Sequence, residues 1–141
     1  MKKNILTHAF CFVLMVFLLV PTASATDLAN ISVQPRYTHV RNFCADLYIS
    51  GDGCAQCGGE VELRDSSYSA NLTVELQRSS NGRSWSTIKD WTTSDTRFAS
   101  LDKEWYVSSG YKYRVYATVE VSAPDGTVVE TVPAYSPTSE Y

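Results

Sequence analysis

The sequence predicts an all-β protein: an antiparallel two-sheet β-sandwich of about seven strands, preceded by a signal peptide helix. Two observations lead to this fold class. Apolar and polar residues alternate with a period of two along most of the chain after Phe43, which indicates strands with one buried and one solvated face. Glycine, asparagine and proline turn signals separate these runs at short intervals, as is typical of sandwiches and barrels.

The N-terminal segment has the three regions of a secretory signal peptide. Lys2 and Lys3 precede an apolar run over residues 9–20, and the small residues 23–25 follow. Charged, apolar and small-residue regions in this order are the mark of such a signal, and the run is shorter than the ~20 residues of a membrane-spanning helix. We therefore expect residues 1–25 to be removed and a bacterial, secreted protein to remain, with no membrane anchor after cleavage.

The remaining 116 residues suffice for one domain with its own core. We expect residues 26–42 to be an N-terminal lead-in segment and residues 43–141 to be the β-sandwich domain. Without Lys2 and Lys3, ten basic residues stand against fifteen acidic ones, a net charge of −5. The basic residues are scattered, whereas phosphate binding needs clustered Lys and Arg, so the composition argues against nucleic acid as a partner.

The first two expected strands form a hairpin around the loop 51–53, Gly-Asp-Gly. Apolar or small residues alternate on both sides of this loop, at Ala45, Leu47, Ile49, Ala55, Cys57, Gly59, Val61 and Leu63. A three-residue loop would pair Leu47 with Cys57 and Cys44 with Glu60. This register places both apolar sets on the same face, as a buried face requires.

The middle of the chain supplies three more strands. The third carries inward-facing Leu72, Val74 and Leu76, and Asn81-Gly82 then closes a hairpin into residues 85–92. Residues 98–107 make a further strand, whose apolar positions are Leu101, Trp105 and Val107.

The clearest strand covers residues 111–121. One face carries Tyr111, Tyr113, Val115, Ala117, Val119 and Val121, and the other carries Lys112, Arg114, Tyr116, Thr118 and Glu120. The turn at 124–126, Pro-Asp-Gly, follows because proline fixes φ and glycine accepts a positive φ. Residues 127–132 then return as the last strand.

Two of these segments resemble bacterial fibronectin type III domains. Residues 74–88, VELQRSSNGRSWSTI, look like that family's third and fourth strands with their Ser-x-(Asp/Asn)-Gly-x-x-Trp hairpin, matched here by Ser79 or Ser80, Asn81-Gly82 and Trp85. Residues 111–117, YKYRVYA, resemble the sixth strand, a Tyr-x-Val-x-Val-x-Ala pattern. The resemblance covers residues 43–141, and the whole chain also looks like small exported single-domain bacterial proteins. It implies a non-catalytic extracellular module and names no ligand.

The resemblance also implies two structural roles. Tyr111 would be the corner tyrosine, whose hydroxyl bonds to the backbone after Val107. Cys57 stands where immunoglobulin domains have their second-strand cysteine, and Tyr113 stands where the disulfide partner of that cysteine would be. We therefore expect Cys57 to lie near Tyr113, without a disulfide.

Three cysteines follow the signal peptide, at Cys44, Cys54 and Cys57. The Cys-x-x-Cys spacing of the last two occurs in redox pairs and zinc knuckles, but here glycines and a strand follow rather than a helix, and His39 is the sole histidine after the signal peptide. We expect Cys57 to be a buried core thiol, with no metal or other cofactor. Cys44 and Cys54 should lie on the outer face, where oxidation could link two molecules as a dimer.

The aromatic residues offer a further candidate site. We expect Trp85 and Trp105 to pack inside or along the sandwich. A possible surface patch for a glycan consists of Tyr48, Tyr68, Trp91 and Tyr116. Glu60 and Glu62 share one strand face, and a solvated face explains them better than a glycosidase pair.

The sequence thus favours an exported, non-catalytic β-sandwich module for extracellular binding or assembly. Its partner would be an extracellular protein or a glycan. The alternative is a carbohydrate-binding module, and a more distant one is a thiol-disulfide redox protein that uses Cys54 and Cys57.

Overall fold

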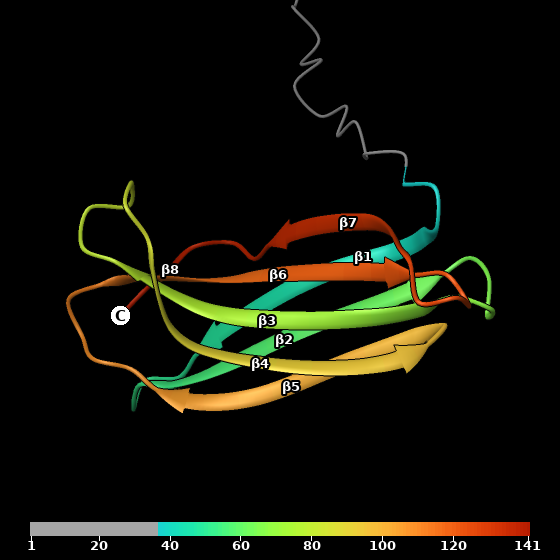
Figure 1. Ribbon diagram of the computed structural model, residues 1–141. Helices are drawn as coiled ribbons and strands as arrows, with labels where there is room; N and C mark the ends of the chain where they lie inside the picture. Colours follow the sequence, from blue (N-terminus) through green and yellow to red (C-terminus); the bar gives the residue numbers. More distant parts are fainter. Residues whose placement is uncertain (1–36) are drawn as a thin grey trace, which may run out of the picture. The chain divides into compact units, whose positions relative to one another are not determined.

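The computed structural model describes residues 37–141, which form two antiparallel β-sheets packed face to face (Figure 1). The predicted all-β sandwich is confirmed. The predicted signal peptide, residues 1–25, and the lead-in residues 26–36 lie outside the described residues.

The smaller sheet has the order β1-β2-β5, with β1 at Val40–Ile49, β2 at Cys54–Leu63 and β5 at Phe98–Tyr106. Its first hairpin has the predicted register: Leu47 lies opposite Cys57, and Cys44 lies opposite Glu60. The first strand begins inside the segment that we expected to be a lead-in, so the sandwich starts before residue 43.

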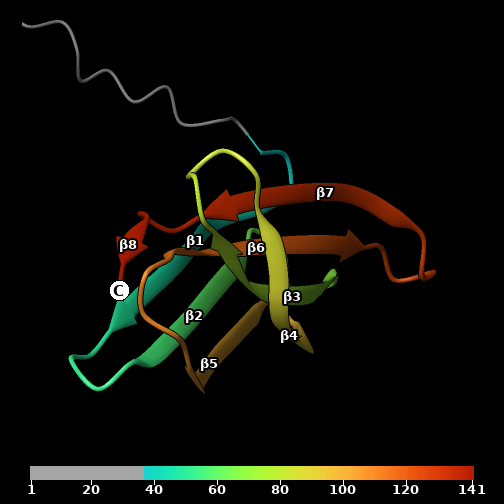
Figure 2. The same ribbon diagram turned by 90° about the vertical axis from the view of Figure 1, so that its left-hand side faces the viewer.

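The larger sheet has the order β4-β3-β6-β7, with β3 at Ser69–Ser79, β4 at Ser86–Thr96, β6 at Lys112–Ser122 and β7 at Val128–Tyr135. A two-residue strand, β8 (Ser139–Glu140), was not predicted. It pairs with the first residues of β6, beyond the point where β7 ends (Figure 2).

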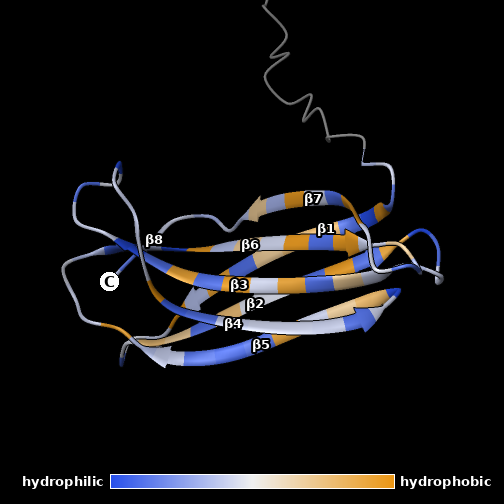
Figure 3. Ribbon diagram, viewed as in Figure 1, coloured by the Kyte–Doolittle hydropathy of each residue, from blue (hydrophilic) through white to orange (hydrophobic). Residues whose placement is uncertain are grey.

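The core lies between the sheets and is made of alternate residues of each strand, as the banding along β3 and β6 in Figure 3 shows. Cys57 is one of its buried members and, as predicted, a free thiol. Gly59 marks a close approach of the sheets, because a Cβ atom there would lie 2.7 Å from Cγ2 of Val74. As the alternation predicted, every second residue is buried in the central strands of both sheets.

The two sheets also meet along their sides (Figure 1). At the β1 and β7 side, the Glu130 carboxylate accepts hydrogen bonds from the backbone N–H groups of Thr38 and His39, at 2.8 and 2.7 Å. At the β4 and β5 side, Lys89 Nζ lies 5.9 Å from the ring centroid of Trp91 and 5.2 Å from that of Trp105.

The exposure of these two tryptophans differs from the prediction. Trp105 is 42% exposed, although it faces inward, because it sits near the end of an edge strand where the other sheet covers it only in part, through Lys89. Trp91 was expected at the surface, but it is half-buried and packs on the core, since it pairs with the inward-facing Val74.

The prediction that Tyr111 is the corner tyrosine is wrong. Tyr113, not Tyr111, donates its hydroxyl to the backbone carbonyl of Ser108, at 2.6 Å. Tyr111 is half-buried instead, with the guanidinium of Arg78 4.4 Å from its ring centroid. Tyr113 takes this role because its ring lies fully inside the core at the start of β6, which directs the hydroxyl towards the preceding loop.

Candidate functional site

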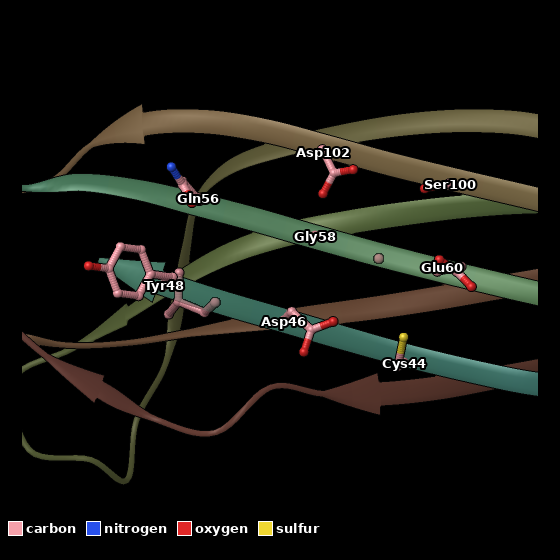
Figure 4. Close-up of a pocket in the computed structure, with 10 residues that line it drawn as sticks. Cys44, Asp46, Tyr48, Gln56, Gly58, Glu60, Ser100 and Asp102 are labelled. Carbon is pink, nitrogen blue, oxygen red and sulfur yellow. The ribbon is translucent and has the colours of Figure 1, made fainter. Parts of the chain in front are cut away.

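The outer face of the three-stranded sheet contains a depression of about 380 Å³ (Figure 4). Its floor is Gly58, which has no side chain to fill the centre of the face. Asp46 and Asp102 pair with Gly58 from the neighbouring strands and stand on either side of it (Figure 4). Tyr48 and Gln56 line one end of the depression.

This outer face, which we name the acidic face, is rich in carboxylates: Asp46, Glu60, Glu62, Asp102 and Glu104. Arg41 forms an ion pair with Glu62 at 3.1 Å. Among residues 37–141, no other basic side chain forms an ion pair with a carboxylate of this face. The face therefore presents an excess of hydrogen-bond acceptors. Two exposed tyrosines, Tyr48 and Tyr106, add aromatic surface to it.

Cys44 lines the other end of the depression, beside Glu60 and Ser100. Partial burial raises the pKa of the Cys44 thiol, and the negative charges of Asp46 and Glu60 raise it further. The thiol therefore stays protonated at neutral pH, whereas nucleophilic cysteines need a stabilised thiolate.

The Cys-x-x-Cys pair is split between the two faces of β2. Cys57 points into the core, where burial raises its pKa to about 12, and its Sγ donates to the carbonyl oxygen of Ala55 at 3.8 Å. Cys54 lies on the outer side, and its pKa is also raised, by desolvation and then by Glu104 and Asp52. A redox pair needs one thiol of lowered pKa, so this environment disfavours thiol-disulfide chemistry.

Metal binding has no candidate in the part of the chain that the structure describes. No three His, Cys, Asp or Glu side chains within residues 37–141 come together as a metal ion would require. These residues also contain no helix long and apolar enough to cross a membrane.

The outer face of the larger sheet carries a different cluster, a stack of four side chains that we name the ladder: Trp85, Arg114, Tyr135 and Tyr116. The Arg114 guanidinium lies 4.3 Å from the ring centroid of Trp85 and 4.6 Å from that of Tyr135. Tyr135 in turn stacks with Tyr116, with centroids 4.8 Å apart and an interplanar angle of 29°.

Hydrogen bonds fix the ladder in place. Arg114 Nε donates to Oε1 of Gln77 at 2.9 Å, and the Gln77 amide donates to Glu75 at 3.2 Å. The loop that holds Trp85 is ordered by Ser79, whose hydroxyl accepts from the backbone N–H of Gly82 at 2.8 Å. The Asn81 side chain accepts from the backbone N–H groups of Arg83 and Ser84, so the Ser-Asn-Gly motif orders the loop that leads into Trp85.

The predicted surface patch is not a single patch. Tyr48 is 63% exposed on the acidic face, whereas Tyr116 belongs to the ladder on the opposite sheet. Tyr68 packs against His39, with ring centroids 4.5 Å apart, and Trp91 is half-buried. Glu60 and Glu62 do share the outer face of β2, as expected.

Sequence reasoning missed several members of both surfaces. The alternation along residues 111–121 placed Arg114 and Tyr116 on the solvated face. The sequence therefore predicted the position of two of the four ladder residues. Tyr135 joins them because it pairs with Tyr116. This pairing depends on a register shift near the start of β7, and no pattern in the sequence predicts that shift.

A scan against protein-family models and a search of the curated proteins found no match to this chain.

Proposed function

We propose that this chain is an exported, non-catalytic β-sandwich module that binds an extracellular protein through the ladder. The observation that carries the proposal is the ladder itself: a tryptophan, an arginine and two tyrosines held together on one sheet face. Trp, Tyr and Arg are the residues that dominate the binding energy of protein interfaces.

Preorganisation strengthens this argument. Ordering a flexible side chain at an interface costs about 0.5–1.5 kcal/mol, and stacking and hydrogen bonds already restrain Arg114 in the free protein. Tyr135 remains 54% exposed at the same time. The ladder thus combines rigidity with accessible aromatic surface, which favours a binding role.

The fold is consistent with the family resemblance, and we propose that the domain is of the fibronectin type III-like kind. The matched hairpin motif falls between β3 and β4, and the matched Tyr-rich segment is β6, which pairs with β3. In constant-type immunoglobulin domains the fourth strand joins the sheet of the first two. Here β4 joins β3 in the other sheet instead, which supports the fibronectin-like alternative.

Photo-crosslinking in the producing culture tests the binding role. A benzophenone amino acid in place of Tyr135 should capture a protein adduct of one defined mass. The same probe in place of Tyr48, on the opposite face, is the control and should capture none. Arg114→Ala should reduce the adduct, whereas Lys112→Ala on the same strand should not. Adducts from the Tyr48 probe alone, or from neither probe, would contradict the proposal.

A carbohydrate-binding module is the second candidate, and the depression in the acidic face favours it. Asp46, Gln56 and Asp102 surround the open floor at Gly58 and could hydrogen-bond sugar hydroxyls, while the exposed Tyr48 ring could stack on a sugar face. A glycan array tests this candidate: binding that Tyr48→Ala abolishes and Tyr135→Ala retains would support it. Binding to no glycan would contradict this second candidate, and protein binding through the ladder would remain as the proposed function.

A further inference from the structure

Apart from the two-residue β8, the two sheets have four edge strands, and three of them carry features that prevent edge-to-edge pairing. Lys89 in β4 and Lys103 in β5 occupy inward-facing positions, opposite Leu76 and Cys57. In β7, Pro133 lies on the side away from β6, because the backbone N–H of Ser136 donates to the Val115 carbonyl of β6 at 3.0 Å and alternate residues point the other way. Inward-pointing charges and edge prolines are known ways to block strand addition.

The fourth edge strand, β1, has a β-bulge near its start, between Val40 and Asn42, but neither an edge proline nor an inward-pointing charge in the rest of its length. It is ten residues long, contains no proline, and has no charged residue at its inward-facing positions between Phe43 and Ile49. The hydrogen bond from Ser50 N–H to the Cys54 carbonyl fixes the direction of the backbone groups. Even-numbered residues from Asn42 onward bond towards β2, so the N–H and C=O groups of Phe43, Ala45 and Leu47 point the other way. No strand within residues 37–141 pairs with β1 on that side, which we name the free edge.

We propose that the free edge of β1 pairs with β1 of a second copy of this chain. The two strands would run antiparallel about a two-fold axis at Cys44 and join the two three-stranded sheets into one continuous sheet. This goes beyond the proposed binding role, which concerns the other sheet.

The backbone fits this register. Phe43 would lie opposite the second copy's Ala45, and both residues direct their N–H and C=O groups to the free edge, so they can exchange hydrogen bonds. Cys44 would lie opposite the second copy's Cys44 in a non-hydrogen-bonded pair, where Cα atoms are about 4.5 Å apart.

The side chains are self-complementary in the same register. Asn42 would face the second copy's Asp46, so an amide meets a carboxylate and no like charges lie directly opposite one another. Phe43, half-buried against the core, would be covered on its remaining side by the second copy's strand. One two-fold axis therefore allows backbone hydrogen bonds to form, places Asn42 opposite Asp46, and covers Phe43.

The two thiols would then stand within disulfide range, since bonded cysteines have Cα atoms less than about 7 Å apart. Strand pairing itself requires no oxidation. With oxidised glutathione as the oxidant, the two Cys44 thiols lose two protons and two electrons, the S–S bond forms, and the oxidant is reduced to two glutathione thiols.

Hydrogen exchange on the purified, reduced protein tests the pairing directly. The amides of Phe43 and Ala45 should exchange quickly at low protein concentration and slow down as concentration rises. The amides of Cys44 and Asp46 should be protected throughout, because they bond to β2. Exchange at Phe43 and Ala45 that does not depend on concentration would overturn the proposal.

Two matched pairs of variants complete the test. In sedimentation equilibrium, Phe43→Lys should weaken dimerisation by about tenfold or more, because it places an inward-pointing charge in the pairing edge, while Phe98→Lys on β5 should leave it unchanged. Under oxidised glutathione, Cys54→Ser should still give a disulfide-linked dimer and Cys44→Ser should not. Equal effects within either pair, or a dimer that depends on Cys54, would overturn the proposal.

Discussion

At the scale of single residues, Tyr113 shows why an aromatic residue with a polar end can occupy a core position. Its ring is fully buried among the strands, while its hydroxyl reaches the carbonyl of Ser108 in the loop before β6. A buried hydroxyl without a partner would be costly. The position thus combines apolar burial with one fixed tie between a strand and its loop.

We predict that Tyr113→Phe lowers the free energy of unfolding by about 1 kcal/mol, the usual net contribution of one hydrogen bond. The ring and its packing remain, so only the bond to Ser108 is lost. Tyr111→Phe is the matched control and should have a smaller effect, because its hydroxyl has no such bond. Urea unfolding measures both, and an equal loss in the two variants would contradict the assignment.

Cys57 should make stability depend on alkaline pH. Burial raises its pKa from 9.0 to about 12, so the native state keeps the proton at a pH where the unfolded chain releases it. The associated stability is fully present below pH 9 and is lost as pH rises towards 12, by at most about 1.4 kcal/mol per pH unit. Cys57→Ala should show a shallower decline in urea unfolding between about pH 9 and pH 11. Parallel declines would contradict this.

At the scale of elements, the adjacent glycines of β2 have separate roles. Gly59 lets the two sheets approach, and Gly58 leaves the depression open on the other side. We predict that Gly59→Ala destabilises the protein by about 1–3 kcal/mol, as overpacking does. Gly58→Ala should be nearly neutral, because its Cβ would meet the mobile end of Asp102 at 3.2 Å. Urea unfolding compares the two, and equal losses would show that backbone conformation, not packing, requires these glycines.

Elements that depend on local pattern were predictable from the sequence. The loop 51–53 and the two apolar sets around it fixed the register of the first hairpin, and the structure has the same pairs. The hairpin at Asn81-Gly82 was equally clear, because few residues adopt the positive φ found at Gly82.

Elements that depend on distant neighbours were not. Alternation assigned Trp105 to the inner face, and only the extent of the facing sheet decides that this part of the face is incompletely covered. The pairing of Tyr135 with Tyr116 requires a register shift between β6 and β7. The acidic depression likewise depends on β5 lying beside β2, a contact between segments far apart in the sequence.

At the scale of the whole molecule, the two outer faces are chemically different. The three-stranded sheet presents carboxylates around a glycine floor, and the larger sheet presents the aromatic ladder with Arg114. The two sides between the sheets are also distinct: Lys89 lies between two tryptophans at one, and Glu130 binds backbone amides at the other. One buried core therefore supports two chemically distinct outer faces, and polar contacts join the two sheets along both sides.

The Glu130 contact gives the last prediction. Its carboxylate joins β7 of one sheet to the residues that lead into β1 of the other, through two hydrogen bonds to backbone N–H groups. Hydrogen bonds to charged groups contribute about 1.5–3 kcal/mol, so Glu130→Ala should lower the free energy of unfolding by about that amount. Glu120→Ala on β6, an exposed glutamate of the same sheet, is the control and should cost less. The amides of Thr38 and His39 should also exchange faster in Glu130→Ala alone. Unchanged exchange there would mean that the sheets are held on this side by packing rather than by the carboxylate.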